Sequence, residues 1–393
     1  MIFYGKHFID KNDIKSVTST LKSSYLTQGP KVETFENNLK KYFGAKYCCA
    51  VSNGTAALHL SVLALQSKNK DCILVSPITF LASANAILYS KAKPVFVDID
   101  PKNYCIDMFK LEKQIKILKK KKIKVKAVIA TDYAGQSCDW HKIKKLSKKY
   151  NFVTINDNCH SLGTKYLDDH QYACKYADIV IQSYHPLKTI TTGEGGSILT
   201  NSRKIFEKVK LLRSHGVLRN NFLSKKYGNW FYSMKELGFN YRLSDIHASL
   251  GISQLKKINK FVNRRRYLAR KYDELFSNKI LYTTPYKEKY NKHSYHLYPL
   301  KINFKNLKIN KIFLFKFLEK KKIRLQVHYI PIHLQEYYKK KFNYKLGDYP
   351  VAEDYYKNTL SLPIFFNLKT SQQERIFKII NTLCLKNIKK NQI

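Results

Sequence analysis

Between residues 45 and 200, short apolar runs alternate with segments of helical length. In order they read KYCCAVS and TAALHLSVLAL, CILVSP and FLASANAILYS, PVFVDI, KAVIATDYA, FVTIND and ADIVIQSY. Strands that alternate with helices predict an α/β fold with a mainly parallel sheet covered on both faces. In such a sheet, ligands bind at the carboxyl ends of the strands. A functional site is therefore expected in the loops that follow these strands.

The chain of 393 residues is long enough for a large domain and a smaller one. A long helical region is predicted at about Leu243–Phe276, with Ser244 or Asp245 placed to cap its start, and it is expected to link the two domains. The sequence beyond it reads as a strand (YHLYPLKINF), a helix (310–321), a strand (IRLQVHYI) and a helix (371–385). We therefore divide the chain into a large domain at 1–245 and, at 246–393, the linker helix with a smaller α+β domain.

Two polar motifs follow predicted strands. Ser52–Thr55 lies between a strand and a helix, where Gly54 permits close backbone approach and the helix start offers N–H groups to an anion. A strand-turn-helix also needs such residues for purely structural reasons, so this motif is weak by itself. Asp157 ends the strand FVTIND. A carboxylate there could cap the next turn, or it could face the ring nitrogen of a bound pyridoxal group and keep it protonated.

Lys188 stands in the segment SYHPLKTITTGEGG, after the apolar run IVIQS and before a glycine-rich turn. With 72 lysine and arginine residues in the chain, a single lysine is usually a surface charge. This position, however, predicts partial desolvation. Desolvation lowers the pKa of an ammonium group and favours the free amine, which forms Schiff bases.

The formal net charge of +44 invites a nucleic-acid hypothesis, because a basic surface releases counterions from phosphate backbones. The lysines, however, are spread over the chain and accompany many Ile, Asn and Tyr residues, as an AT-rich genome would produce. No RNP-type aromatic strand, zinc finger or Arg-rich recognition helix is present. We therefore expect no specific nucleic-acid partner, although anionic ligands such as sugar nucleotides would be attracted loosely.

The eight cysteines show neither a C-x-x-C pair nor a metal-ligand spacing, so we interpret them as reduced and structural and expect no metal site. No apolar run reaches the roughly 18 residues that would cross a bilayer. The opening MIFYGKHFIDKND carries charges where a secretory signal has its apolar core. These features predict a cytoplasmic protein with no membrane partner.

Segments along nearly the whole chain resemble the DegT/StrS-type family of sugar aminotransferases, which have the fold of aspartate aminotransferase (PLP fold type I). They are SNGTAALHL, PITFLASANAILYSKAKPVFVDID, NDNCHSLG, SYHPLKTITTGEGGSILTN, LRSHG, LGFNYRLSDIHASLGISQL and YHLYPL. Within the family, YGKHFID, LKSSYLTQGPKVETFE, HPLKTITTGEGG and QVHYIPIHLQEYY resemble the branch of the pseudaminic acid pathway. That branch aminates the 4-keto carbon of a UDP-linked 6-deoxy-N-acetylhexosamine, with L-glutamate as the expected donor.

For the cofactor, pyridoxal 5′-phosphate (PLP), the resemblance implies that Lys188 forms the Schiff base and shuttles the proton. It also implies that Asp157 pairs with the pyridinium nitrogen. Phe80 would lie against the cofactor ring, although an aromatic side chain there also suits core packing. His160 would stand next to the ring, and a satisfied core histidine is the alternative.

The resemblance also implies a phosphate site shared between two subunits. Gly54, Thr55 and Ser183 of one subunit would bind the phosphate. Asn240 of the other subunit would reach across the dimer interface and bind the same phosphate. A homodimer with shared active sites is therefore expected.

For the sugar nucleotide, the resemblance implies contacts from the N-terminal segment and from two loops. Arg242 could pair with a substrate carboxylate or with the diphosphate, and an interface salt bridge is the alternative. The implied substrate contacts are Tyr4, Leu26, Thr27, Gln28, Gly29, Gln326, Val327, His328 and Tyr329.

One departure from the family pattern surrounds the key acid. The family reads acid-Asp-small at this point, whereas this chain reads Asn156-Asp157-Asn158. Dehydratase relatives replace the lysine, so Lys188 favours transamination. Three alternatives remain open: a different keto nucleotide sugar such as a GDP- or dTDP-linked one, a regulatory protein with the same fold but no catalysis, and a basic nucleic-acid protein.

Overall fold

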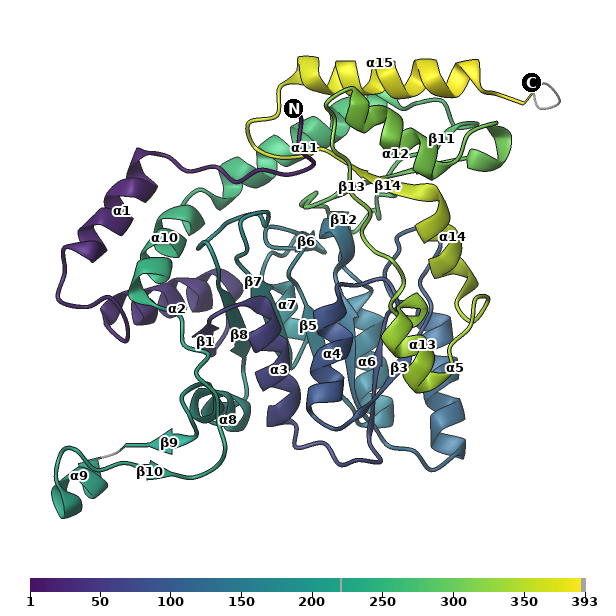
Figure 1. Cartoon of the computed structure of the whole chain (residues 1–393). Coiled ribbons are helices and arrows are strands. Elements are labelled where there is room, and N and C mark those ends of the chain that lie inside the picture. The colour runs from purple at the N-terminus through teal and green to yellow at the C-terminus, as the bar shows by residue number, and fades with distance from the viewer. Residues whose placement is uncertain (220, 390–393) are drawn as a thin grey trace.

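The computed structural model describes residues 1–219 and 221–389. Its larger part is built on a seven-stranded sheet (Figure 1). Across the sheet the strands are β1 (Tyr47–Val51), β8 (Gly196–Thr200), β7 (Ile179–Ser183), β5 (Val153–Asp157), β4 (Val125–Thr131), β2 (Cys72–Val75) and β3 (Lys93–Phe96). Each apolar run between residues 45 and 200 that the sequence pattern assigned to a strand is confirmed, and β8 is an addition.

The sheet is mainly parallel, as predicted. The pairs β2–β3, β2–β4, β4–β5 and β5–β7 are parallel, whereas β8 runs antiparallel to both β7 and β1. Between Ser183 and Gly196 the chain forms no helix that could carry it back to the other end of the sheet, so β8 must return antiparallel. The β7–β8 loop, which contains Lys188, therefore lies at the carboxyl end of β7.

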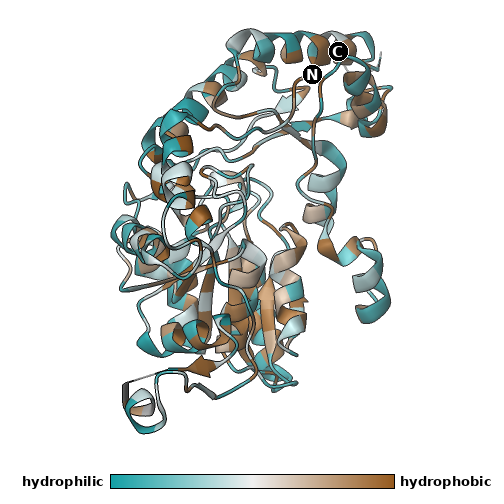
Figure 2. Ribbon diagram, turned by 60° about the vertical axis from the view of Figure 1, so that its left-hand side comes forward, coloured by the Kyte–Doolittle hydropathy of each residue, from teal (hydrophilic) through white to brown (hydrophobic). Residues whose placement is uncertain are grey.

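Helices cover both faces of this sheet, and the strands are apolar on both sides (Figure 2). In β2, for example, Cys72 and Leu74 pack against one layer while Ile73 and Val75 pack against the other. The first layer contains α2 (Pro30–Phe43), α5 (Met108–Lys120), α6 (Trp140–Tyr150) and α7 (Tyr172–Tyr176). The second contains α3 (Gly54–Ala64), α4 (Leu81–Tyr89) and α8 (Arg203–Arg213).

The long helical region predicted over 243–276 is two helices, α10 (Asp245–Leu255) and α11 (Ile258–Leu275). Ser244 caps α10, because its side chain accepts the N–H of His247. The Asp245 carboxylate instead accepts backbone N–H groups at the start of α2. The first half of α11 packs into the core of the large sheet and its second half packs into a separate apolar cluster.

That separate cluster is the core of a smaller unit at the C-terminal side (Figure 1). Ile2, from the first residues of the chain, also packs into it and pairs with Ile323. The unit consists of an antiparallel sheet of β11 (Tyr282–Thr283), β13 (Tyr298–Ile302) and β14 (Thr359–Leu362), with α12 (Lys311–Lys320) and α15 (Thr370–Lys386).

The strand predicted for IRLQVHYI, residues 323–330, is wrong. Only two isolated bridges occur there, from Ile323 to Ile2 and from Gln326 to Ser361. Because each partner is a single residue, no ladder forms. Five consecutive residues of this segment, Gln326–Ile330, instead line a cavity, described below.

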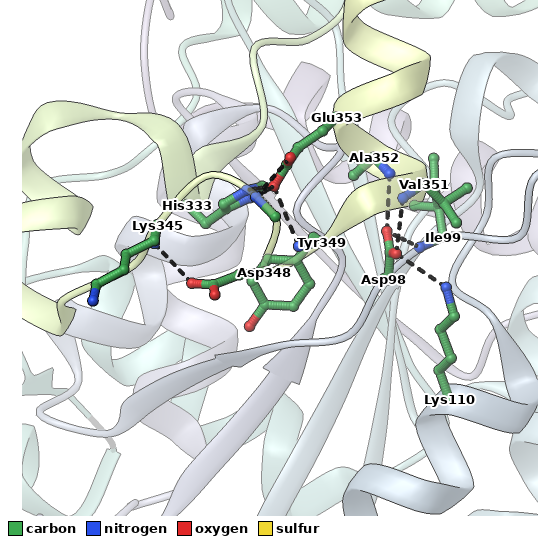
Figure 3. A network of polar contacts seen from close by, with 11 residues as sticks. Asp98, Ile99, Lys110, His333, Lys345, Asp348, Tyr349, Val351, Ala352 and Glu353 are labelled. Atoms are coloured by element: carbon green, nitrogen blue, oxygen red, sulfur yellow. Dashed lines mark hydrogen bonds and ion pairs between the residues drawn. The ribbon is translucent and has the colours of Figure 1, made fainter.

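After this segment the chain returns to the large sheet through η3 (Ile332–Leu334), α13 (Glu336–Phe342) and α14 (Pro350–Asn358). Two carboxylates hold the returning segment in place (Figure 3). Asp98, just after β3, accepts the N–H groups of Val351 and Ala352 at the start of α14. Glu353 accepts from His333 at 2.9 Å and from backbone N–H groups of the turn before α14.

The remaining elements are peripheral. Helix α1 (Lys11–Leu21) packs on α10, and residues 217–219 and 221–237 form an arm that projects from the body (Figure 1). The arm contains β9 (Val217–Leu218), α9 (Asn221–Tyr227) and β10 (Ser233–Met234). The short elements η1 (Tyr133–Gly135), β6 (Lys165–Tyr166), β12 (Asn291–Lys292) and η2 (Phe304–Asn306) complete the fold. In the described ranges, every helix is too short or too polar to cross a membrane.

Candidate active site

A cavity of about 640 Å³ opens at the carboxyl ends of the parallel strands. One side, here called the strand wall, is formed by residues that end strands of the sheet or lie in the loops after them, including Thr131, Asp157 and Lys188. A second side, here called the loop wall, is formed by Tyr4, His296 and the segment Gln326–Ile330. The cavity therefore lies where the α/β pattern predicted a ligand site.

Lys188 is held in the β7–β8 loop by its own backbone, because its N–H donates to the carbonyl of His185 at 2.8 Å. Its side chain is partly buried and lines the cavity. Burial lowers the pKa of its ammonium group, and the nearby Cys159 and Asp157 act in the opposite direction. The desolvation predicted from the position of Lys188 is thus present, and it increases the population of the free amine.

Asp157 is the last residue of β5, and its carboxylate lies on the cavity side of the sheet with only 5% of the residue exposed. Its Oδ2 accepts the hydroxyl hydrogen of Ser83 at 2.7 Å. Ser83 is in turn bonded to Thr79 at 3.0 Å, and Thr131 donates to Thr79 at 3.1 Å. This row of hydroxyl groups fixes the orientation of the carboxylate, and its second oxygen, Oδ1, accepts the backbone N–H of Cys159 at 3.3 Å.

The two asparagines that depart from the family pattern point away from the cavity. Successive side chains of a strand alternate between faces, so Asn156 and Asn158 lie opposite Asp157. Both donate to Oδ2 of the buried Asp132, at 3.0 and 2.9 Å. Tyr172 donates to the same oxygen at 2.7 Å. The asparagines therefore satisfy a buried carboxylate of the core and leave the environment of Asp157 unchanged.

The start of α3 forms a cradle suited to an anion. The side chain of Asn53 accepts the N–H of Ala56 at 2.8 Å, while the N–H groups of the first two residues, Gly54 and Thr55, lie at the cavity. A Cβ atom on Gly54 would meet the Cβ of Ser183 at 2.8 Å, and one on Gly196 would meet the Asn53 carbonyl carbon at 2.5 Å. Only glycine lets these loops close around the helix start, where the helix dipole favours negative charge.

The loop wall is held by side chains rather than by a strand ladder. The carbonyl of His328 accepts the hydroxyl groups of Tyr133 and, at 3.1 Å, of Tyr355. The His328 ring contacts the hydroxyl of Ser361 at 2.8 Å and packs against Tyr4 at a centroid distance of 5.3 Å. Burial and the charge of Lys188 lower the pKa of His328 to about 3, so this histidine is neutral at neutral pH.

His160 connects the two walls. Its Nε2 lies 3.1 Å from the hydroxyl of Tyr329, and its ring packs on that of His296 at a centroid distance of 4.4 Å. Burial, together with the nearby Lys188 and His328, holds the pKa of His160 well below its usual value. The cavity is thus lined by neutral imidazoles beside the amine of Lys188 and the carboxylates of Asp157 and Glu194.

Comparisons with known proteins agree with this geometry. The model of the DegT/DnrJ/EryC1/StrS aminotransferase family matches residues 7–381. The chain belongs to this family. It is 38% identical over 97% of its length, and 98% of the relative, to the UDP-4-amino-4,6-dideoxy-N-acetyl-beta-L-altrosamine transaminase of Campylobacter jejuni. The predicted family and α/β fold are therefore confirmed, and the protein is an aminotransferase.

Two solved structures share the whole fold of this aminotransferase. PseC of Helicobacter pylori, an aminotransferase involved in the biosynthesis of pseudoaminic acid, has a TM-score of 0.89 at 33% identity and covers 98% of this chain and 99% of its own. A protein of Streptococcus pneumoniae named as a sugar aminotransferase, solved in its PLP form, has a TM-score of 0.86 at 25% identity, covering 98% of both chains. Family relatives thus use PLP in this fold.

The aminotransferase brings most of the predicted site residues to one cavity. The predicted residues that line it are Tyr4, Gly54, Thr55, Phe80, Asp157, His160, Ser183, Lys188, Gln326, Val327, His328 and Tyr329. The predicted residues that lie outside its lining are Leu26, Thr27, Gln28, Gly29, Asn240 and Arg242. Three of these residues instead form isolated backbone bridges with other parts of the chain: Thr27 with Ser244, Arg242 with Val51, and Asn240 with Ser214.

Several lining residues were not singled out from the sequence. Thr79, Ser83 and Thr131 orient Asp157, and His296 packs on His160. Thr131 lies in the run KAVIATDYA and His296 lies in the segment YHLYPL, so both stood in segments already recognised. Their distant partners, however, come from other strands and loops, and only the folded chain shows the pairing.

Proposed function

We propose that this aminotransferase transfers an amino group from L-glutamate to the 4-keto carbon of a UDP-linked 4-keto-6-deoxy-N-acetylhexosamine, with PLP as its cofactor, in the cytoplasm. The observation that carries the proposal is the placement of Lys188 and Asp157. A lysine with a lowered pKa and a buried carboxylate line the same cavity, at the ends of neighbouring strands. An amine and an acid in this arrangement suit the two ends of a pyridoxal ring.

The residues present fit this cofactor. Lys188 would bond to its aldehyde carbon, Asp157 would face the ring nitrogen, and the start of α3 with Ser183 would hold the phosphate. Bound PLP supplies an electron sink that stabilises negative charge on the donor carbon. Lys188, once free, would move the proton between the donor carbon and the cofactor, a general acid–base task that its lowered pKa favours. The row of hydroxyl groups behind Asp157 would keep that carboxylate facing the ring.

The identity of the sugar is supported by the relatives and by the loop wall. The chain is 38% identical to the Campylobacter jejuni transaminase named above and 34% identical, over 95% of each chain, to its namesake from Helicobacter pylori. The residues that the resemblance assigned to the sugar nucleotide, from Tyr4 and Gln326 to Tyr329, form one continuous side of the cavity. A substrate bound there would lie in the same cavity as Lys188.

A homodimer would explain the predicted site residues that lie outside the cavity lining. Asn240 and Arg242 lie outside the lining of their own chain's cavity, and in our proposal they complete the cavity of a second copy. The arm formed by residues 217–219 and 221–237 supports this assembly, because Trp230 and Leu237 on it are 79% and 78% exposed. Large apolar side chains that gather on a projecting segment are typical of a surface covered by a partner.

The test offers the purified enzyme L-glutamate with UDP-, GDP- and dTDP-linked 4-keto sugars and follows the nucleotide product by mass spectrometry. We expect replacement of the keto oxygen by an amine on the UDP-linked sugar. Preferred amination of a GDP-linked sugar would overturn the assignment of the substrate but not the reaction. That alternative has some support, because the chain is also 30% identical to the GDP-perosamine synthase of Escherichia coli over 93% of each chain.

A further inference from the structure

Three groups in the active site form an unbroken row. The backbone N–H of Ala134 donates to Nδ1 of His160 at 3.3 Å, and Nε2 of His160 lies 3.1 Å from the hydroxyl oxygen of Tyr329. Ala134 has a positive φ of 59° within the short η1 turn. A left-handed conformation is uncommon for alanine, and such positions cluster at functional sites. The row thus starts at a backbone group that the turn directs toward His160.

The chemistry of these groups fixes the direction of each bond. A backbone N–H can only donate, so Nδ1 of His160 must accept and cannot carry a hydrogen. A neutral imidazole then carries its single hydrogen on Nε2. Nε2 must therefore donate to the Tyr329 oxygen. Since that hydroxyl has only one hydrogen, Tyr329 is left to donate it elsewhere.

The surroundings keep His160 in this neutral form. The residue is only 4% exposed, and one face of its ring is covered by the His296 ring at a centroid distance of 4.4 Å. Burial is the main cause that lowers the pKa of His160, followed by the positive charge of Lys188 and by His328. A second proton on His160 would have to be bound to Nδ1. It would then point at the Ala134 N–H, which is a donor and cannot accept it.

We propose that His160 is a positioning residue that fixes the Tyr329 hydroxyl as a hydrogen-bond donor to an oxygen atom of the ligand in the cavity. Tyr329 lines the cavity beside Phe80, whose ring lies 5.9 Å from its own. The identity of that ligand rests on the proposed function. Two oxygen acceptors could receive the bond, the phenolate oxygen of the cofactor or an oxygen of the keto sugar, and the two sources are separable by experiment.

The first test reads the hydrogen on His160 directly. Protein labelled with ¹⁵N-histidine is examined at pH 7 by long-range ¹H–¹⁵N correlation, and the His160→Asn variant identifies the signal of this residue among the 12 histidines. We expect a neutral ring with its hydrogen on Nε2. A hydrogen on Nδ1, or a doubly protonated ring, would overturn the proposal. Because this test requires no turnover, it remains decisive even if the proposed sugar is not the substrate.

The second test asks whether His160 acts through Tyr329. We expect Tyr329→Phe to lower kcat/KM about 10-fold, the size of one lost hydrogen bond to a polar ligand group. His160→Gln, whose amide can reproduce the donor at Nε2, should retain more activity than His160→Asn, which reaches only the Ala134 side. In a Tyr329→Phe background, the difference between Gln and Asn at position 160 should disappear. A difference that persists there would mean that His160 acts by another route.

The source of the acceptor is resolved by the same Tyr329→Phe variant. If the acceptor is the cofactor, the absorbance maximum of the cofactor-loaded enzyme shifts before any substrate is added. If it is the sugar, that spectrum is unchanged and KM for the sugar rises while KM for glutamate does not. A variant with an unchanged spectrum and unchanged kinetic constants for both substrates would refute the proposed donor role of Tyr329.

Discussion

The two walls of the active site are built by different means. The strand wall takes its residues from the ends of β4, β5 and β7, so backbone ladders set the position of Asp157 and of the loop that carries Lys188. The loop wall has no ladder. Its central residue, His328, is held by hydroxyl groups of Tyr133, Tyr355 and Ser361. The chemistry is thus placed on regular structure, whereas the groups assigned to the sugar stand on a segment held by individual side chains.

Because the walls are built differently, we expect substitutions on them to have different effects. A change on the strand wall should remove chemistry while the fold and the binding of the sugar persist. A change on the loop wall should weaken sugar binding and stability together, because the same side-chain contacts that shape the wall join the two core regions. Sites on rigid elements with variable loops opposite them suit a family in which one reaction serves different substrates.

The largest effect is expected at Lys188. Lys188→Ala removes the amine that bonds to the cofactor and moves the proton, so turnover should fall below detection. Lys188→Arg should do the same, since a guanidinium stays protonated and cannot form the bond. The measurement is product formation by mass spectrometry together with the borohydride-sensitive absorbance band of the cofactor. Turnover retained by either variant would contradict the assigned role of Lys188.

A smaller but still large effect is expected at Asp157. Asp157→Asn keeps the shape and removes the charge that would face the ring nitrogen, so kcat should fall by roughly 10²–10³-fold, the usual effect of one preorganised polar group in a reaction. Ser83→Ala removes only the hydrogen bond that orients this carboxylate and should cost less. KM for the sugar should stay within about twofold in both variants, because neither residue belongs to the loop wall. A selective rise in KM for the sugar would show that the walls are not independent.

The same contrast explains what could be predicted from the sequence. The strand wall follows from local pattern: apolar runs ending in Asp157 and Ser183 place these side chains at one edge of a parallel sheet. The antiparallel β8 was not predicted, although the absence of a helix after Ser183 already requires it. The order of the strands, in contrast, depends on crossovers that no local pattern specifies.

The loop wall could be located only through resemblance. Alternation in IRLQVHYI is typical of a strand, yet its partners are Ile2 and Ser361, each distant in sequence and each a single residue. Similarly, the hydrogen bonds of Asp98 and Glu353 join residues that periodicity does not relate. Side chains that satisfy distant partners in this way leave no repeating signal, so the pattern indicated the wrong structure here.

On the loop wall, His328 should make stability depend on pH. Its pKa is lowered from 6.5 to about 3 in the folded protein, first by burial and then by Lys188. Between about pH 3 and pH 6.5, His328 is protonated in the unfolded chain but neutral in the folded chain. The free energy of unfolding therefore falls as the pH drops below about 6.5. The variant His328→Asn removes this group. The decrease in the free energy of unfolding between pH 7 and pH 5 should therefore be smaller by about 2 kcal/mol.

The matched variant is His293→Asn, outside the lining of the cavity. Burial also lowers the pKa of His293 to about 3, so its removal should flatten the stability profile by a similar amount. Chemical denaturation at a series of pH values measures both slopes. Only His328→Asn should also raise KM for the sugar. Equal effects of the two variants on KM would remove the link between the loop wall and sugar binding.

The smallest effect tests how the loop wall is supported from a distance. Asp98 caps the start of α14 (Figure 3). Helix α14 also carries Tyr355, whose hydroxyl donates to the His328 carbonyl. Asp98→Ala should therefore lower the free energy of unfolding by about 1 kcal/mol, the usual cost of a lost cap, and raise KM for the sugar.

Asp107→Ala is the control, because Asp107 caps α5 through the N–H of Lys110 at 2.9 Å and α5 does not line the cavity. It should cost a similar free energy and leave KM unchanged. If the two variants change KM alike, α14 does not support the loop wall. The loop wall would then be held only by the residues that contact it directly.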